Sequence, residues 1–255
     1  MGIFQGKKLR EEFSIAPPII AKAACALFNL HTMGCEKAVF ASVESGRSWP
    51  FTDAENEPSS NPLTIDGPTM NETINRIRVV PGETVRQFLD RLQEDQLLIE
   101  MYSHAPVASI IERLAVSDII VDGEGKGQLS DGSADAKTFS DCLPRQIFDW
   151  LPPVRPIEQE GSFEPRMRAL EILSRTDLGI VWFPSLIDDK VLLLDATWDD
   201  AQLRSSEVHE AMSKFIYAIV WLSEPSNLDR PVMECEFDIS GYEITDLGPW
   251  ENYHR

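Results

Sequence analysis

The apolar residues in the first part of the chain recur at intervals of three and four positions. A stripe of this kind follows Pro17-Pro18 and comprises Ile19, Ile20, Ala23, Ala24, Leu27 and Phe28. It predicts a helix that ends near His31 to Gly34, with proline tolerated in its first turn. The segment Lys37 to Glu44 is rich in β-favouring residues and predicts a strand buried on both faces. Gly46 to Pro68 is rich in Ser, Pro, Asn, Asp and Glu, which is typical of a loop.

Polar and apolar residues alternate between Thr73 and Val80, which predicts a second strand. The sequence Pro81-Gly82-Glu83-Thr84 predicts a turn, and Thr84 is a candidate N-cap for the helix that follows it. We expect that helix to end near Met101 or Tyr102. Its core face has four apolar residues, which are Val85, Phe88, Leu89 and Leu92.

Two further apolar runs, Leu178 to Phe183 and Lys190 to Ala196, flank Ile187-Asp188-Asp189 and predict a β-hairpin. Upstream of this hairpin, Val107 to Leu114 predicts a short helix. The segment Asp122 to Asp141 contains four glycines among several Ser and Asp residues and carries little apolar material. It predicts a mobile surface excursion.

The last predicted helix begins at Ser205 or Ser206, either of which is expected to act as its cap. Its apolar face includes Phe215 and Ile216, so both side chains are predicted to be buried. The tail from Glu224 to Arg255 is polar with scattered aromatic residues, and we expect it to be an extension packed onto the surface.

Composition and charge exclude several classes of protein. The chain has 255 residues, 43% of them hydrophobic, which is enough for one substantial core or two modest ones. Its net charge of −19 repels phosphate backbones and anionic lipid surfaces, so neither nucleic acid nor a membrane is expected as a partner. The ordinary explanation for such acidity is solubility. The sequence has no apolar run of about 18 residues and no secretory signal, which predicts a cytoplasmic protein.

Known catalytic and metal-binding motifs are absent from the sequence. It has no GxSxG elbow, Walker-type glycine loop, HExxH pair or glycine fingerprint after a strand. Its cysteines are scattered, which predicts neither a metal site nor a disulfide framework, and Cys25 is expected in a helix core. These cysteines are Cys25, Cys35, Cys142 and Cys235. We therefore predict no catalytic residue and no metal ligand in this chain.

Several short motifs stand in a fixed order along the chain. They are His31-Thr32-Met33-Gly34, Ser45-Gly46-Arg47, Gly67-Pro68-Thr69-Met70-Asn71, Pro81-Gly82-Glu83-Thr84 and Gln146 to Pro153. Their order and spacing resemble the second half of a nonribosomal peptide synthetase condensation domain. The resemblance covers roughly Phe13 to Leu222 and lies in the order of the motifs, because none of them is diagnostic alone. Where the family usually has Asn-Thr, this chain has Asn71-Glu72.

The resemblance implies an α/β (α+β) fold, in the form of one chloramphenicol acetyltransferase-like lobe with a mixed central β-sheet and helices packed on it. Residues 1–222 would form this C-terminal lobe, including the excursion near 122–141, and residues 223–255 would be an extension packed on it. The implied partners are an N-terminal condensation lobe, peptidyl carrier protein domains and a thioester-bound aminoacyl or peptidyl substrate. No cofactor would bind directly, and the phosphopantetheine arm of a carrier protein would tether the substrate.

The same resemblance implies a substrate-binding wall. The loop that begins at Gly67 would face the reaction tunnel between the two lobes. The candidate substrate-binding residues are Thr69, Asn71, Ser45 and Arg47. Asn71 either donates a hydrogen bond to a substrate amide or phosphopantetheine arm, or satisfies local backbone groups at a turn. Arg47 either contacts a ligand or fixes its loop by pairing with a carboxylate.

The family's catalytic motif, His-His-x-x-x-Asp-Gly, lies in the first half of the domain and is absent here. The four histidines are isolated, and His31 is predicted to interact with the dipole at a helix end. The leading hypothesis is therefore the C-terminal half of an amide-bond-forming or cyclising condensation domain, part of a larger synthetase and inactive without its N-terminal lobe. The alternative is a non-catalytic binding or scaffold module that docks a carrier protein or a partner lobe. The sequence leaves open the substrate, the choice among condensation, cyclisation and epimerisation, and whether the chain is a fragment or an independent gene product.

Overall fold

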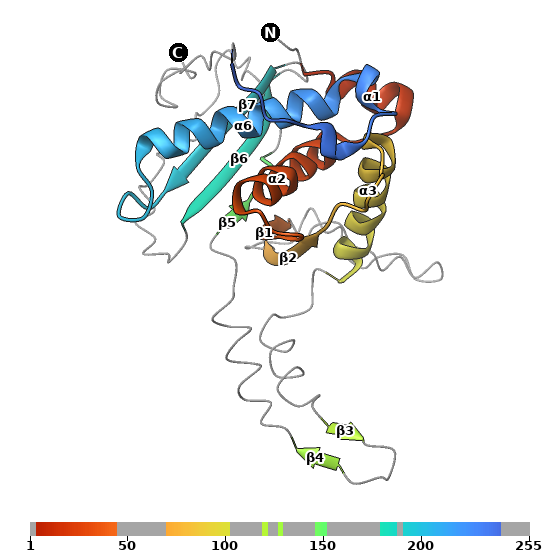
Figure 1. The fold of residues 1–255 in the computed structure, drawn as a ribbon, viewed down its shortest axis with the longest axis vertical. Helices are drawn as coiled ribbons and strands as arrows, with labels where there is room; N and C mark the ends of the chain where they lie inside the picture. The colour runs from red at the N-terminus through yellow and green to blue at the C-terminus, as the bar shows by residue number, and fades with distance from the viewer. Residues whose placement is uncertain are drawn as a thin grey trace, which may run out of the picture.

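The computed structural model describes residues 4–44, 70–102, 119–121, 127–129, 146–151, 179–187 and 191–240. A five-stranded sheet with the order β2-β1-β5-β6-β7 lies at its centre (Figure 1). The strands are β1 (Ala38–Glu44), β2 (Asn71–Ile77), β5 (Gln146–Phe148), β6 (Ile180–Ile187) and β7 (Val191–Trp198). The central strands β1, β5 and β6 are parallel, whereas β2 and β7 pair antiparallel at the two edges. This mixed sheet confirms the predicted fold class.

Three long helices lie on the face of the sheet that is turned toward the viewer in Figure 1. They are α2 (Pro17–Met33), α3 (Val85–Tyr102) and α6 (Ser205–Ser223), and a shorter helix α1 (Gly6–Phe13) precedes them. Two short strands, β3 (Ile119–Val121) and β4 (Gly127–Leu129), form a separate antiparallel pair. The predicted helix at Val107 to Leu114 lies outside the described residues.

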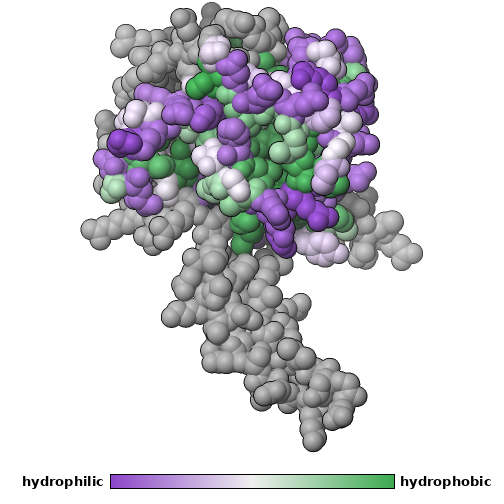
Figure 2. Space-filling model, in the orientation of Figure 1, coloured by the Kyte–Doolittle hydropathy of each residue, from purple (hydrophilic) through white to green (hydrophobic). Residues whose placement is uncertain are grey.

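The helix α2 packs against both α6 and α3, and it is buried almost all round from Ile19 to Phe28. Apolar side chains gather in the middle of this face of the molecule, with polar ones around them (Figure 2). A helix that is apolar on nearly all sides belongs in the interior, and the four alanines of α2 let its neighbours approach closely. Cys25 is fully buried in this helix, as predicted.

Three aromatic rings join α2, β6 and α6. The ring of Trp182 meets those of Phe28 and Phe215 edge-on, with centroid distances of 6.0 and 5.2 Å. Phe28 and Phe215 stack at 6.4 Å. Phe215 is fully buried, which confirms the prediction for this residue, whereas Ile216 is only half-buried and its predicted burial was wrong. The apolar stripe of α6 is therefore centred on Phe215, Ala218, Ile219 and Leu222.

The predicted turn before α3 has the geometry of a type II β-turn. Glu83 N donates a hydrogen bond to Val80 O at 3.0 Å, and Gly82 has a φ of 78° at the position that requires a positive value. Because Val80 begins this turn, β2 ends at Ile77 rather than at Val80 as the sequence predicted. The buried carboxylate of Glu83 accepts two hydrogen bonds from Arg91, at 2.8 and 2.9 Å, and thereby fixes the turn to α3.

Thr84 forms a capping box with Gln87. Its hydroxyl accepts a hydrogen bond from Gln87 N at 3.3 Å, and Gln87 Oε1 accepts one from Thr84 N at 3.1 Å. We expect Thr84→Ala to lower the free energy of unfolding by about 1 kcal/mol, as measured by urea denaturation, because the cap is lost. Thr84→Ser keeps the hydroxyl and should unfold nearly as the wild type does. An equal loss in both variants would show that the hydroxyl does not cap the helix.

The start of α3 is also held by residues 228–232, which we name the C-terminal strap. Val85 N and Arg86 N donate hydrogen bonds to the carbonyl oxygens of Arg230 and Leu228, both at 2.9 Å. These amides belong to the first turn of the helix, where no intrahelical acceptor exists. Within the strap, the side chains of Leu228 and Val232 are buried in the hydrophobic core. The strap thus satisfies α3 through residues that are distant in the sequence.

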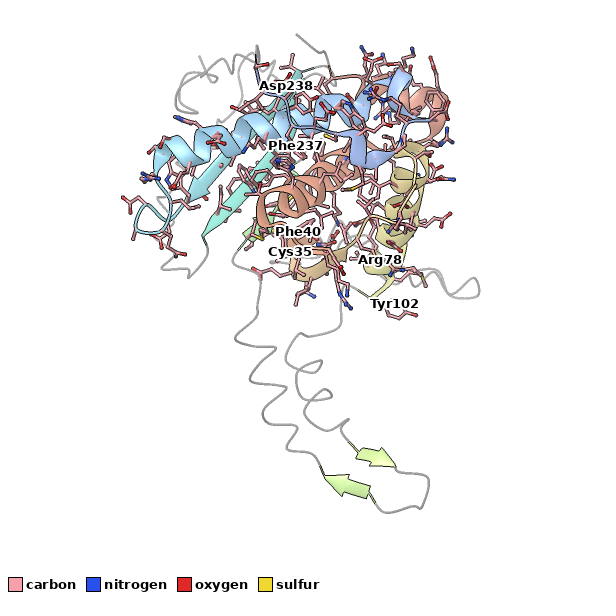
Figure 3. All side chains as sticks on the ribbon, viewed as in Figure 1. Cys35, Phe40, Arg78, Tyr102, Phe237 and Asp238 are labelled. Atoms are coloured by element: carbon pink, nitrogen blue, oxygen red, sulfur yellow. The ribbon has the colours of Figure 1, made fainter. Side chains whose placement is uncertain are left out.

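Residues after the strap pack against α2 and α6. The ring of Phe237 stacks on His31 at 4.4 Å and lies 6.3 Å from the ring of Tyr217 (Figure 3). His31 is in the last turn of α2, where the sequence predicted it, whereas its ring contact with Phe237 was not predicted. The division of the chain at residues 222 and 223 stays a prediction.

Two helix starts differ from the sequence-based expectation. The cap of α6 is Arg204 rather than Ser205 or Ser206, because the Glu207 carboxylate accepts a hydrogen bond from Arg204 N at 2.9 Å and pairs with its guanidinium at 2.7 Å. The helix α1 was not predicted, because its sequence is mostly polar. Its one long buried side chain is that of Leu9.

Candidate functional site

The carboxyl ends of β1 and β5 lie side by side, because these two strands are parallel neighbours. Glu44 ends β1, Asp149 follows β5, and Asn71 begins β2 directly opposite Glu44. Binding sites in sheets with parallel strands form outside the carboxyl ends of those strands. We therefore take this end of the sheet as the candidate functional site of the described part of the chain.

The inner face of β1 and β2 becomes polar toward this end. Ala38 and Phe40 of β1 pack into the core beneath the helices, and alternation along the strand puts Ser42 and Glu44 on the same side. Their register partners on β2 are Thr73 and Asn71. Ser42 Oγ shares a hydrogen bond of 3.0 Å with Thr73 Oγ1 and donates one of 3.1 Å to Glu44 Oε1. The apolar core thus gives way to a hydrogen-bonded polar layer.

Lys22, Glu44 and Gln96 form a closed cluster that joins α2, β1 and α3. The ammonium group of Lys22 lies 3.6 Å from Glu44 Oε1 and donates a hydrogen bond to Gln96 Oε1. Gln96 Nε2 in turn donates to Glu44 Oε2 at 3.1 Å. The side chains of Lys22 and Glu44 are only 7% and 15% exposed. Glu44 is therefore held by partners on several sides, which suits a structural anchor better than a proton acceptor.

Burial lowers the pKa of Lys22, and the charges of Glu44 and Glu100 oppose that shift. A buried ammonium is costly unless a carboxylate compensates its charge. The ion pair with Glu44 is the compensation seen here. This cluster therefore links the stability of the α2–α3 packing to the end of β1, where the candidate site lies.

Burial also raises the pKa of Asp149 above its usual value, and the nearby charge of Glu44 adds to the shift. Titratable groups with perturbed pKa values cluster at functional sites. Asp149 lies at the carboxyl end of β5, where its backbone N–H donates to Trp182 O at 2.9 Å. It is thus the described carboxyl group at this site whose protonated form burial favours.

A raised pKa means that the folded state favours the protonated form of Asp149, so ionisation at neutral pH costs stability. Stability should fall as the pH rises from the ordinary value of Asp149 through its raised pKa. We expect Asp149→Asn to raise the free energy of unfolding at pH 7 by a few tenths to about 1 kcal/mol, because solvent screens part of the effect. Urea denaturation at several pH values should show this gain shrinking toward pH 4. A gain for Asp149→Asn that stays constant across this pH range would contradict the interpretation.

The structure places one of the four predicted substrate-binding residues. Asn71 is half-buried at the start of β2, opposite Glu44. Ser45, Arg47 and Thr69 lie outside the described residues. Glu44, the last residue of β1, and Asn71, the first residue of β2, are register partners. The two strand ends that adjoin the predicted motifs are therefore next to each other.

Sequence reasoning missed Lys22, Gln96 and Asp149. Lys22 carried a detectable signal, because a lysine within the apolar stripe of a buried helix requires a partner. Gln96 and Asp149 carried none, since their roles arise from α3 crossing the end of β1 and from β5 pairing beside it. Such contacts between distant segments leave no local pattern.

The described residues contain no group of three or more His, Cys, Asp or Glu side chains that could hold a metal ion. Within the same residues, no single helix is long and apolar enough to cross a membrane. The pair α1 and α2 would reach that threshold only if counted together across a 116° bend.

No protein-family model matches the sequence, and no curated protein matches it. Solved condensation domains do match the structure. The first condensation domain of the CDA synthetase aligns with a TM-score of 0.58 and 14% identity, over 92% of this chain and 46% of that chain. The first condensation domain of the calcium-dependent antibiotic synthetase in complex with substrate analogue 3a aligns with a TM-score of 0.59 and 14% identity, over 92% of this chain and 45% of that chain. The starter condensation domain of rhizomide synthetase aligns with a TM-score of 0.54 and 11% identity, over 92% of this chain and 46% of that chain.

The chain spans less than half the length of these solved structures, whereas nearly all of it aligns with them. At this level of identity the likeness concerns the fold. The order of the sequence motifs predicted a mixed sheet with helices packed on it, and the structure has this arrangement. The chain therefore has the fold of part of a condensation domain, as its sequence motifs predicted.

Proposed function

We propose that this chain is the C-terminal half of a condensation domain of a nonribosomal peptide synthetase and forms one wall of the tunnel in which carrier-bound thioester substrates meet. The alignment of 92% of the chain with about 46% of a solved condensation domain carries this proposal. The partners are an N-terminal lobe and carrier proteins whose phosphopantetheine arms present the substrates. We place this assembly in the cytoplasm.

The chemistry explains why one half is inactive alone. Amide formation requires an amine held close to an activated thioester, and most of the acceleration comes from positioning the two. A positioned base or hydrogen-bond acceptor supplies the rest. The sequence lacks the His-His-x-x-x-Asp-Gly motif, so the N-terminal lobe supplies the histidine.

Within this proposal, the end of the sheet marked by Glu44 and Asn71 faces the tunnel. Asn71 hydrogen-bonds a substrate amide or the phosphopantetheine arm, and Ser45, Arg47 and Thr69 belong to the same wall. The support for this assignment is that Asn71 is half-buried at a strand end directly opposite Glu44, whose charge also acts on Asp149, the group with the raised pKa. The ion pair of Lys22 and Glu44 keeps this end of β1 in place.

Reconstitution from two halves tests the proposal. The purified chain is mixed with a separately produced N-terminal half of a condensation domain that carries the histidine motif, together with donor and acceptor carrier proteins loaded with aminoacyl thioesters. Mass spectrometry should detect the amide product only when both halves are present. An N-terminal half whose second motif histidine is replaced by alanine is the matched control and should give no product.

Two outcomes would contradict the proposal. Product formation by the chain alone would show that the half carries its own catalytic group. Carrier binding without product in every combination of halves would favour a non-catalytic binding or scaffold module, the alternative that the missing motif leaves open.

In the reconstituted domain, we expect Asn71→Ala to lower kcat/KM about tenfold, the equivalent of one hydrogen bond to the substrate. Glu72→Ala is the control, because Glu72 is the exposed neighbour on the opposite face of β2. Both rates are measured with the same carrier-bound substrates. Equal rates for the two variants would show that Asn71 only completes the turn.

A further inference from the structure

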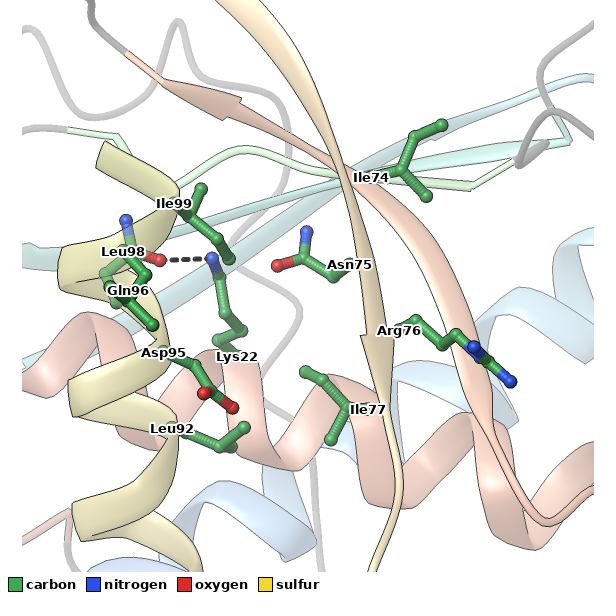
Figure 4. A pocket seen from close by; sticks show the side chains of 10 residues that line it. All are labelled: Lys22, Ile74, Asn75, Arg76, Ile77, Leu92, Asp95, Gln96, Leu98 and Ile99. Carbon is green, nitrogen blue, oxygen red and sulfur yellow. Dashed lines mark hydrogen bonds between the residues drawn. The ribbon is translucent and has the colours of Figure 1, made fainter. Parts of the chain in front are cut away.

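A cavity of about 310 Å³ lies between β2 and the C-terminal half of α3 (Figure 4). Its volume is close to the lower limit for small-ligand sites in proteins. Asn71 is not among its lining residues, and Asn75, which is, lies four positions further along β2, a distance of about 13 Å. The cavity therefore lies further along β2 than Asn71, and it shares Lys22 and Gln96 with the cluster at the end of the sheet.

Asn75 presents a buried acceptor to this cavity. The residue is 2% exposed, and its Nδ2 donates hydrogen bonds to Ser42 Oγ at 2.9 Å and to Phe40 O at 3.4 Å. The carbonyl oxygen of Phe40 can only accept, so Nδ2 must face it and Oδ1 must face the other way. Figure 4 shows the side chain pointing from β2 toward Lys22. Its Oδ1 has no hydrogen-bond partner among the described residues.

The other walls limit the charge of a ligand. Lys22 and Gln96 line the cavity opposite β2, and the ammonium of Lys22 would repel a cationic ligand. An ionised carboxylate or a phosphate group could not donate a hydrogen bond to Asn75 Oδ1. Asp95 on α3, half of whose side chain is exposed, would repel an anion as well. Arg76 also lines the cavity, but Figure 4 shows its side chain pointing away from Lys22. The remaining lining is aliphatic, from Ile74, Ile77, Leu92, Leu98 and Ile99.

The strand that forms the other wall can pair with an extended chain. β2 has β1 on one side and no neighbour on the other among the described strands. Four consecutive residues of β2, from Ile74 to Ile77, line the cavity. The free edge of a strand carries unpaired backbone N–H and C=O groups, which are complementary to the backbone of an added peptide.

We propose that this cavity binds a short, uncharged aliphatic peptide segment that lies along the edge of β2 and donates an N–H to Asn75 Oδ1. The amide backbone of the ligand matches the strand edge, and its aliphatic side chain contacts Leu98 and Ile99. The site depends on neither the tunnel nor a second lobe, so it is tested with the chain alone.

The probe is N-acetyl-leucinamide, titrated into the ¹⁵N-labelled full chain and followed by ¹H–¹⁵N NMR. We expect saturable shifts of the side-chain amide signals of Asn75 and Gln96 and of the backbone signals of β2, with a dissociation constant of about 1 mM. The matched probe is the fully N-methylated analogue, which keeps every acceptor and the leucine side chain but has no N–H. It should bind at least about tenfold more weakly.

Two variants at exposed positions distinguish an effect on ligand binding from an effect on folding. Leu98→Ala removes part of the wall and should weaken binding about threefold or more, whereas Leu97→Ala, its neighbour outside the cavity, should change it less than about twofold. Asn75→Leu should abolish the shifts if the variant folds. Equal binding of the two probes, equal effects of the two leucine variants, or no saturable shift would overturn the proposal and leave a cavity that holds water only.

Discussion

Phe215→Ala is expected to lower the free energy of unfolding by about 3–5 kcal/mol, the usual cost of truncating a fully buried aromatic side chain. The ring of Phe215 is 0% exposed and contacts Phe28 of α2 and Trp182 of β6, so its removal leaves a cavity where three elements meet. Neither neighbouring ring can fill this space by itself, because each is held by its own helix or strand. Urea denaturation followed by circular dichroism measures the loss.

The matched control is Ile216→Ala on the same helix. Ile216 is half-buried, so its truncation removes less apolar surface from the interior and should cost less than half as much. Both variants keep the helix propensity of alanine, which separates packing from helix formation. Equal losses at the two positions would show that α6 does not face the sheet as described.

Glu44→Ala is expected to cost about 3–5 kcal/mol, because it leaves the buried ammonium of Lys22 without the carboxylate that it pairs with and with only the weaker influence of Glu100. The side chain of Lys22 is 7% exposed, and burial already lowers its pKa. The same substitution also removes one of the two acceptors of Gln96 Nε2, the other being Glu100. The loss should diminish at alkaline pH, where Lys22 becomes neutral, because a group with a lowered pKa releases its proton earlier in the folded state.

A double-mutant cycle separates the electrostatic contribution of the ion pair to stability from the packing contribution of its two side chains. Lys22→Met combined with Glu44→Leu replaces both charges by apolar groups and should be far less destabilising than Glu44→Ala alone. The control is the surface pair of Lys7 and Glu11, both 59% exposed, where Glu11→Ala should change stability by less than about 1 kcal/mol. A small loss for Glu44→Ala would indicate that water reaches Lys22.

Local sequence patterns predicted most of the described elements. The stripe of α2, the strand β1, the hairpin β6–β7 and the helix α3 all follow from spacing and turn residues. β6 nevertheless extends to Ile187, which was predicted in the turn. The errors occur where a contact outside the element decides the outcome. α1 is held by Leu9 against the core, and the start of α6 is set by the pairing of Arg204 with Glu207.

The candidate site was predictable only in part. The order of the motifs pointed to the ends of β1 and β2, and the register of Glu44 with Asn71 brings these ends together. The buried acceptor of Asn75 and the bridge through Gln96 were not predictable, because both depend on contacts between segments that are distant in the sequence. The side chains of Thr73 and Asn75 lie beneath the helices, where Ser42 and Phe40 of β1 supply their hydrogen-bond partners.

The C-terminal strap has a consequence for synthesis on the ribosome. The backbone N–H groups of Val85 and Arg86 lack these acceptors until Arg230 and Leu228 are added to the chain, more than 140 residues later. At roughly 5–20 residues per second, this interval lasts on the order of 7–30 s. During that time the first turn of α3 is hydrated and the site later covered by Leu228 and Val232 is open. A nascent chain that stalls before the strap emerges therefore exposes apolar surface, which makes it a substrate for chaperones and for proteolysis.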